Sequence, residues 1–319
     1  MRPYFVRFGQ RWQHFWIAGS GAPLLLLPGS PHSARSLTPL IDALSPSFLV
    51  IVPDLPGNGY SDPLSGSADQ ANHYASAMLT LMDELRIDQF GIYGAHSGAV
   101  IAAEVAILAG ARVSGVVCDG YPLWTQDEAQ SLTDDYLEVI TPVASGAHLS
   151  ALWSRLIDQQ LYFPWFDRNA RNAVDRDLSD SQRIHQLAMD YLNAGDHYTA
   201  SLRSSLRADG ELRLRNINEQ QVRVLLLADA SDVVAEHLTR VPALPNTTSV
   251  HTAGLDDRAR KIGAFFRAAN MTTRDPGAHL PATTRHYVQP RHHSLDAHEW
   301  LYIDIPANAR TVWLHDVGQ

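Results

Sequence analysis

The stretch that most constrains the fold runs from residue 88 to residue 104, where a short apolar segment leads directly into an alanine-rich one. Residues Phe90 to Tyr93 are typical of a buried strand, and the residues that follow the small ones are typical of a helix. The chain must therefore turn sharply from strand to helix. In such a turn the residues two before and two after the tip must be small, because the backbones nearly touch. Gly94 and Gly98 meet this requirement and predict that His96 is the tip.

Ser97 is the alternative residue for the tip. Its small flanking residues would be Ala95 and Ala99, which fit a strained turn less well than glycine does. The length of the preceding segment also favours His96. With His96 as the tip, residues 85–90 match the usual helix-to-strand segment before such a turn without a gap. This geometry is that of a nucleophile elbow, which holds the tip side chain exposed at the carboxyl edge of a sheet. The other interpretation of His96 is a histidine that lies in a tight loop and does no chemistry.

Composition narrows the class of protein. The 319 residues can bury a large core, and 45% hydrophobic with 18% charged residues is ordinary for a soluble globular protein. The net charge of −9 is spread without runs, which argues against a nucleic-acid surface. Cys118 is the only cysteine, so no intramolecular disulfide can form, as expected in a reducing compartment. No apolar signal core begins the chain, and Leu24 to Leu27 is too short to span a bilayer, so we expect a cytoplasmic protein without membrane contact.

Strands and helices are expected to alternate along the chain, which requires a mostly parallel sheet with right-handed crossovers. An edge hairpin is expected over Tyr4 to Ile17 and a closing helix over Asp257 to Ala269. Between them, the expected strands are Pro23 to Leu27, Phe48 to Val52, Phe90 to Tyr93, Val113 to Cys118, Val222 to Leu227 and Thr248 to His251.

Three ordered motifs resemble the α/β-hydrolase superfamily over residues 1 to about 268. Leu26 to Ser30 stands where that family has its oxyanion loop, Asp54 to Ser61 matches its Asp-x-Pro-Gly-x-Gly-x-Ser loop, and the elbow follows at the expected distance. The resemblance implies the α/β-hydrolase fold, with a core of residues 1–123 and 215–270 and an inserted helical cap of residues 124–214. Residues 145–153 and 164–167, with the elbow, also resemble an atypical subgroup with His-Thr-Gly or His-Ser-Gly there and no settled reaction.

The resemblance also implies site residues. Some aromatic side chains of such a cap would line an apolar substrate pocket, and most of them would pack the cap onto the core. The oxyanion donors would be the backbone N–H groups of Ser30 and Ser97. We take the candidate substrate-binding residues to be Trp124, Trp153, Phe163 and Trp165.

The acid and the base of this family are harder to place. Asp232 is the better match for the acid and Asp229 is its rival, and either could instead cap a helix. Asp119, at the end of the neighbouring strand, is a further candidate, since haloalkane dehalogenases of this family have their acid there. Leu255 stands where the base histidine is expected. Three other histidines could replace that base, although a surface or packing role is favoured for each: His32, His148 and His251.

These residues allow three classes of function. The first is an enzyme that hydrolyses an ester, a lactone or a related bond in a small apolar substrate, through Ser97 or through water activated by His96. The second is a non-hydrolytic lyase, isomerase, cyclase or oxygenase in which His96 is the acid/base and pairs with Asp119. The third is a catalytically silent hydrolase-like binding protein. No cofactor and no metal ion is expected in any of them.

The segment 271–319 is not accounted for by a single hydrolase domain. Its residues 286–288, 300–303 and 311–318 echo the opening of the chain in the same order, which predicts the start of a second hydrolase-like copy. The open strand edges of an unfinished copy would favour pairing with another chain, so a homodimer is one expectation. The tail also contains His292, His293, Asp296 and His298, whose spacing fits no standard metal site.

Overall fold

The computed structural model describes residues 1–319 except 67–69, 176, 270, 274–285, 288–301 and 304–319. The sequence prediction of an α/β-hydrolase fold, with a mostly parallel sheet, is confirmed. Within the described residues the main sheet has the strand order β1-β2-β4-β3-β5-β6-β7-β8. The first two strands form the expected antiparallel hairpin, β2 pairs antiparallel with β4, and the remaining neighbours are parallel. The strands are β1 (Arg2–Phe8), β2 (Arg11–Ala18), β3 (Ala22–Leu27), β4 (Phe48–Pro53), β5 (Phe90–Ala95), β6 (Val113–Asp119), β7 (Val224–Asp229) and β8 (Thr247–Thr252).

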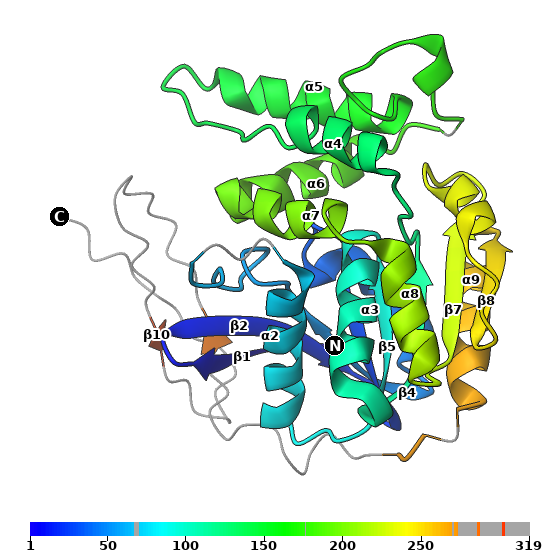
Figure 1. Cartoon of the computed structure of the whole chain (residues 1–319). Coiled ribbons are helices and arrows are strands. Elements are labelled where there is room, and N and C mark those ends of the chain that lie inside the picture. Colours follow the sequence, from blue (N-terminus) through cyan, green and yellow to red (C-terminus); the bar gives the residue numbers. More distant parts are fainter. Residues whose placement is uncertain (67–69, 176, 270, 274–285, 288–301, 304–319) are drawn as a thin grey trace.

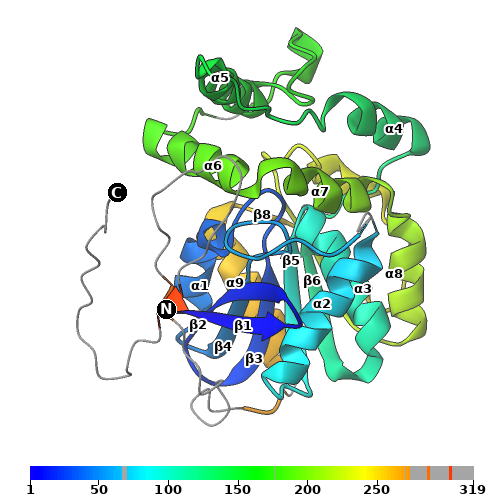
Figure 2. The ribbon, with the colours of Figure 1, turned by 90° about the vertical axis from the view of Figure 1, so that its left-hand side faces the viewer.

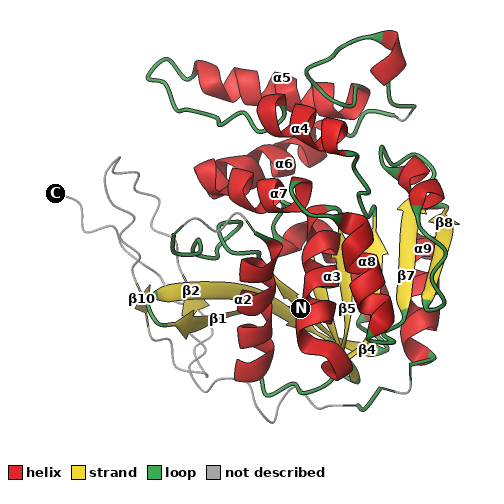
Figure 3. Ribbon diagram, in the orientation of Figure 1, coloured by secondary structure: helices red, strands yellow, loops and turns green. Residues whose placement is uncertain are grey.

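Helices cover both faces of this sheet (Figures 1 and 3). One face carries α2 (Ala71–Glu84), α3 (Ser97–Ala109) and α8 (Gly210–Glu219), and the other carries α1 (Thr38–Leu44) and α9 (Gly254–Arg267). This explains the unbroken apolar run in β3, because successive strand residues point to opposite faces. Leu25 and Leu27 belong to the first core and Leu24 and Leu26 to the second, all four with no exposed surface. Each such burial contributes roughly 2–3 kcal/mol.

Four helices inserted between β6 and β7 lie beyond the carboxyl ends of the strands, as Figures 1 and 2 show. They are α4 (Gln126–Asp135), α5 (Ala147–Leu161), α6 (Ser181–Ala194) and α7 (Tyr198–Leu206), called the cap helices below. A small core of their own, which includes Leu152, Leu156 and Tyr191, joins α5 to α6. Helix α8 begins before the predicted boundary at residue 214 and packs against α3 of the core. The division into core and cap at residues 124 and 214 stays a prediction.

The buried Arg155 stabilises the cap helices from within. Its guanidinium donates to the carbonyl oxygens of Tyr136 and Glu138, at 3.1 and 2.8 Å, and lies 4.7 Å from the centre of the Trp165 ring. Hydrogen bonds and a stacked aromatic face are what a buried guanidinium requires. The side chain therefore joins the start of the cap to α5.

Most of the C-terminal segment lies outside the described residues. Two short strands are described there, β9 (His286–Tyr287) and β10 (Tyr302–Ile303), and they pair antiparallel. The expected second copy, and the homodimer inferred from it, otherwise concern residues outside the described ranges. The same holds for the cluster His292, His293, Asp296 and His298.

Candidate functional site

The turn between β5 and α3 consists of one residue, His96, with φ 49° and ψ −115°. Such a conformation costs about 1–3 kcal/mol in a residue with a side chain. The neighbouring glycines make it possible, since a Cβ on Gly94 would lie 2.2 Å from the carbonyl oxygen of Gly98, and one on Gly98 would lie 2.5 Å from that of Pro28. The amide of His96 donates to the carbonyl oxygen of Asp119 at 2.8 Å. Contacts with neighbouring backbone segments therefore fix the position of the His96 Cα and Cβ atoms, from which the imidazole extends.

The imidazole of His96 pairs with Asp232, which lies in the loop after β7. The distance from Nε2 to Oδ2 is 3.3 Å, and the histidine side chain is 53% exposed. The other oxygen of Asp232 accepts the amide of Val234 at 3.0 Å, which orients the carboxylate. A carboxylate at Nε2 favours the tautomer with its proton on that nitrogen, so Nδ1 keeps a lone pair. Gly120 lies directly beside the ring, as a Cβ there would lie 2.9 Å from Nδ1.

The carboxylate of Asp119 has other partners, although it was a sequence candidate for the partner of His96. It is buried, accepts the hydroxyl of Tyr93 at 2.7 Å and pairs with Arg258 of α9 at 3.1 Å. Burial raises the pKa of Asp119, and the Arg258 charge and the Tyr93 hydrogen bond oppose this shift. Tyr93 and Arg258 thus bind the carboxylate of Asp119. The carboxylate that pairs with the His96 ring is that of Asp232.

Asp229, the rival acid, binds backbone groups instead. Its carboxylate accepts the amide of Gly254 at 2.8 Å and the amide and hydroxyl of Ser231 at 3.1 and 2.8 Å. Burial would raise the pKa of Asp229, but these hydrogen bonds outweigh it and the pKa is lowered. Leu255, at the expected base position, lies in the first turn of α9 and is 39% exposed. Below it, Arg258 lies between the carboxylates of Asp119 and Asp229.

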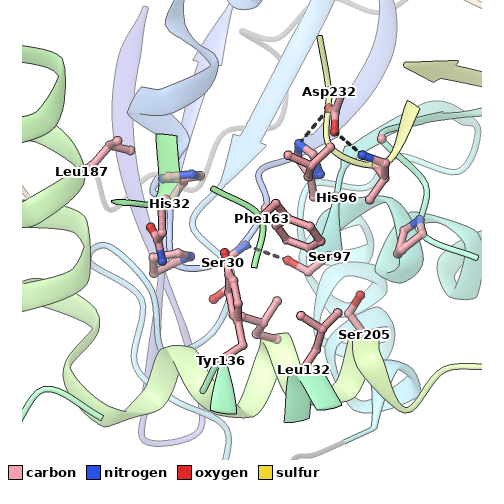
Figure 4. Close-up of a pocket in the computed structure, with 18 of the residues that line it drawn as sticks. Ser30, His32, His96, Ser97, Leu132, Tyr136, Phe163, Leu187, Ser205 and Asp232 are labelled. Atoms are coloured by element: carbon pink, nitrogen blue, oxygen red, sulfur yellow. Dashed lines mark hydrogen bonds and ion pairs between the residues drawn. The ribbon is translucent and has the colours of Figure 1, made fainter. Parts of the chain in front are cut away.

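The two residues expected to supply the oxyanion donors are hydrogen-bonded to each other through the side chain of Ser97. The amide of Ser30 donates to Oγ of Ser97 at 2.7 Å, and Ser97 is only 3% exposed (Figure 4). Within the described part of the chain, no imidazole nitrogen lies within hydrogen-bond distance of Ser97 Oγ. The amide of Ser97 begins α3 and has no acceptor inside the helix, as is general for the first amides of a helix. The helix N-terminus thus offers donors beside the His96 ring.

A cavity of about 440 Å³ lies between this turn and the cap helices. Its floor is polar, and Figure 4 shows Ser30, His32, His96, Ser97 and Asp232 around it. Its roof is mostly apolar and comes from the cap. The apolar residues of the roof are Trp124, Leu132, Tyr136, Leu156, Phe163, Leu187, Tyr191, Leu202 and Leu206.

Of the four predicted substrate-binding aromatic residues, the structure places two at this cavity. Trp124 and Phe163 line it and stack on each other with ring centres 6.0 Å apart. Trp153 packs within the core of the cap helices, and Trp165 covers Arg155, so neither is among its lining residues. The aliphatic lining residues of the cap were not singled out from the sequence, because a leucine on a cap helix looks the same whether it faces the core or the cavity.

The three histidines considered as replacements for the base lie in different places. His32 lines the cavity, with Nδ1 3.6 Å from Oδ2 of Asp190. His148 accepts the amide of Val143 within the cap, and His251 is exposed on β8. Sequence reasoning missed Asp190, which is 158 residues away from His32.

Two further searches concern the described residues only. No three His, Cys, Asp or Glu side chains in that part of the chain converge as the ligands of a metal ion would. Its helices also include none with the length and apolar composition that crossing a bilayer requires.

Comparison with known proteins gives relatives by sequence and by structure. A haloalkane dehalogenase of Mycobacterium tuberculosis is 30% identical over 132 residues, which are 39% of this chain and 46% of that protein. A soluble epoxide hydrolase of Corynebacterium sp. is 38% identical over 90 residues, which are 28% of this chain and 31% of that protein. The chain thus matches less than half the length of these curated relatives.

Solved structures agree over a longer part of the chain. An epoxide hydrolase from Vigna radiata superimposes with a TM-score of 0.61 at 18% identity, covering 84% of this chain and 98% of that one. A thermophilic esterase from Thermogutta terrifontis has a TM-score of 0.62 at 17% identity, with coverages of 85% and 100%. At such identities the likeness shows the fold alone. The α/β-hydrolase-fold family itself matches residues 22–232, a range that includes most of the sheet, the β5–α3 turn and Asp232, and this chain therefore belongs to that family.

Proposed function

We propose that this protein is an enzyme that hydrolyses an ester, a lactone or a related bond in a small, largely apolar molecule, using water activated by His96. One observation carries the proposal. An imidazole stands where the fold exposes its nucleophile, and it is paired with Asp232 on the polar floor of a cavity with an apolar roof. The names of the relatives, which include a dehalogenase, epoxide hydrolases and an esterase, also favour a hydrolytic reaction.

The proposed mechanism is general-base catalysis. Asp232 orients the ring from the Nε2 side, and the neutral ring accepts a proton from water at Nδ1. The water oxygen bonds to the carbonyl carbon, and the negative charge that develops on the carbonyl oxygen is stabilised by the amide of Ser97. The amide of Ser30 adds a second donor when the hydroxyl of Ser97 turns away from it. General-base catalysis of this kind accelerates a reaction by about 10²–10⁴-fold.

Ser97 is not the nucleophile in this proposal. A serine hydroxyl needs an adjacent base, and its described partner is the amide of Ser30, which is a donor. No acyl-enzyme is therefore formed. A fluorophosphonate probe should leave Ser97 unlabelled while the protein still hydrolyses its substrate.

The decisive test compares three variants on a panel of short-chain esters, lactones and epoxides. His96→Gln should lower kcat by at least about 100-fold, and Asp232→Asn by about 10–100-fold, because the ring loses its preferred tautomer and orientation. His251→Gln is the matched control, since His251 is exposed on β8 away from the cavity, and should behave as the wild type. Thermal unfolding verifies that the variants are folded. A His96→Gln enzyme with the wild-type rate on the best substrate would exclude this mechanism.

A second candidate function is proton transfer without hydrolysis, as in a lyase, isomerase or cyclase. It is favoured by the bond between the Ser30 amide and Ser97 Oγ, which occupies one of the two donors that acyl chemistry uses. Isotopes separate the two reactions. Hydrolysis places ¹⁸O from labelled water in the product, whereas proton transfer places deuterium from D₂O on a product carbon.

A further inference from the structure

A second histidine lies close to the proposed reaction centre, on the loop after β3. The amide of His32 donates to the carbonyl oxygen of Gly29 at 2.9 Å, which turns the loop back on itself. A Cβ on Gly29 would lie 3.3 Å from Cβ of His96. The loop that carries His32 is therefore in contact with the turn that carries His96. Both rings line the same cavity, with Ser30 between them in the view of Figure 4.

His32 has its own carboxylate, Asp190 of α6. Nδ1 of His32 lies 3.6 Å from Oδ2 of Asp190, and the other oxygen of this carboxylate accepts the hydroxyl of Ser33 at 2.9 Å. Nδ1 is enclosed and has no hydrogen-bond partner within the described residues, whereas the side chain as a whole is 32% exposed. The exposed surface of the side chain therefore belongs to atoms other than Nδ1, and the side chain lines the cavity. A ring that carries a proton on Nε2 can donate it from that nitrogen.

We propose that His32 is the general acid of the reaction proposed above, and that the substrate class is accordingly the unactivated alkyl ester or lactone. This inference rests on the proposed function. His96 takes a proton from water as the water oxygen bonds to the carbonyl carbon. When the bond from that carbon to the leaving oxygen breaks, the leaving oxygen takes a proton from Nε2 of His32. The proton on His96 then returns to His32 through solvent, and the products are one acid and one alcohol.

The chemistry of the leaving group explains why this second group matters. An alkoxide is a strong base and leaves slowly unless it is protonated, whereas a nitrophenolate leaves without a proton. Two His–Asp pairs around one cavity supply both transfers, one group as base and the other as acid. A single imidazole would have to pass the same proton from the attacking to the leaving oxygen.

The test compares two esters of one acyl group, for example ethyl butyrate and 4-nitrophenyl butyrate. His32→Gln should lower kcat on the ethyl ester by about 100-fold and leave the nitrophenyl ester within about threefold of the wild type. Asp190→Asn should show the same selectivity with a smaller loss. His185→Gln, an exposed position on the same helix as Asp190, is the matched control and should change neither rate. Equal losses on both esters, or no loss on either, would overturn the role of His32.

A binding measurement tests the same idea without turnover. The probe is monobutyl butylphosphonate, whose tetrahedral anion resembles the addition intermediate, with ¹⁵N NMR of the imidazole nitrogens as readout. Shifts at both His32 and His96 are expected. A shift at His96 alone overturns the role of His32 and leaves the proposed function standing, whereas an unchanged rate in His96→Gln removes the proposed function itself. A spectrum in which neither ring responds counts against both.

Discussion

Replacing Gly120 by alanine should displace the His96 ring without substituting any residue that takes part in the proposed reaction. Gly120 follows β6 with φ +62°, and a Cβ there would lie 2.8 Å from Cε1 of His96, 2.9 Å from Nδ1 and 3.2 Å from Oδ2 of Asp232. Real Cβ atoms do not approach other atoms as closely as the first two of these distances. The added methyl group must therefore displace the His96 ring from its position beside Asp232. The substitution therefore tests whether the His96–Asp232 geometry matters.

The expected cost has two parts. An alanine forced into a left-handed conformation loses about 1–2 kcal/mol. The added methyl meets outer atoms of the His96 ring, which is 53% exposed and can move into the cavity, so crowding adds less than about 1 kcal/mol. Gly146→Ala isolates the first part, because Gly146 has φ +74° and nothing within 4 Å of an added Cβ. The two variants should thus lose similar free energies of unfolding, within about 1 kcal/mol of each other.

The assay combines urea denaturation of both variants with kinetics on the best ester and ¹⁵N NMR of the His96 ring. A displacement of about 1 Å in a reacting group costs on the order of 100-fold in rate, so Gly120→Ala should lose that much while Gly146→Ala keeps wild-type activity. The reasoning is refuted if Gly120→Ala retains the wild-type rate and the wild-type His96 spectrum.

Two further predictions concern the charges around the fold. Asp119→Asn removes the buried partner of Arg258 and should lower the free energy of unfolding, measured by urea denaturation, by about 3 kcal/mol. Asp83→Asn, which breaks an exposed ion pair, is the control and should cost less than about 1 kcal/mol. Similar losses in the two variants would contradict the described burial. The Arg240 guanidinium lowers the pKa of Glu128 from 4.5 to about 2, so the charged carboxylate stabilises the fold fully above pH 4.5 and this contribution is lost as the pH falls towards 2. Glu128→Gln should accordingly be less stable than the wild type at pH 7, by a margin that shrinks from pH 4.5 downward, and a margin that is constant with pH would count against the pair.

What the sequence predicts well is set by local sterics. The turn after β5 is an example, because Gly94 and Gly98, four positions apart with the tip residue midway between them, leave only one arrangement of the backbones. The unbroken run of leucines in β3 similarly has to be buried on both faces. These patterns are sufficient for the fold class because each is decided within about ten residues.

The choice among the acids depends instead on contacts between distant segments. Asp119 and Asp232 follow neighbouring parallel strands, so both are near the turn, and their spacing in the sequence favours neither. What separates them is Arg258, which reaches Asp119 from a helix 139 residues later in the chain. His32 is similar, since its partner Asp190 belongs to the cap. Side-chain partners of this kind cannot be inferred from periodicity, because periodicity describes only which face of an element is apolar.

The position of Arg258 also limits how this scaffold could be redesigned. His96→Ser together with Leu255→His would reproduce the side chains of an ordinary esterase, but two of the three candidate acids, Asp119 and Asp229, already pair with Arg258. Removing that guanidinium would leave the buried carboxylate of Asp119 without its cationic partner. A redesign as a serine enzyme would therefore have to replace the Arg258 ion-pair cluster together with residues 96 and 255. Single substitutions within that cluster would destabilise the protein.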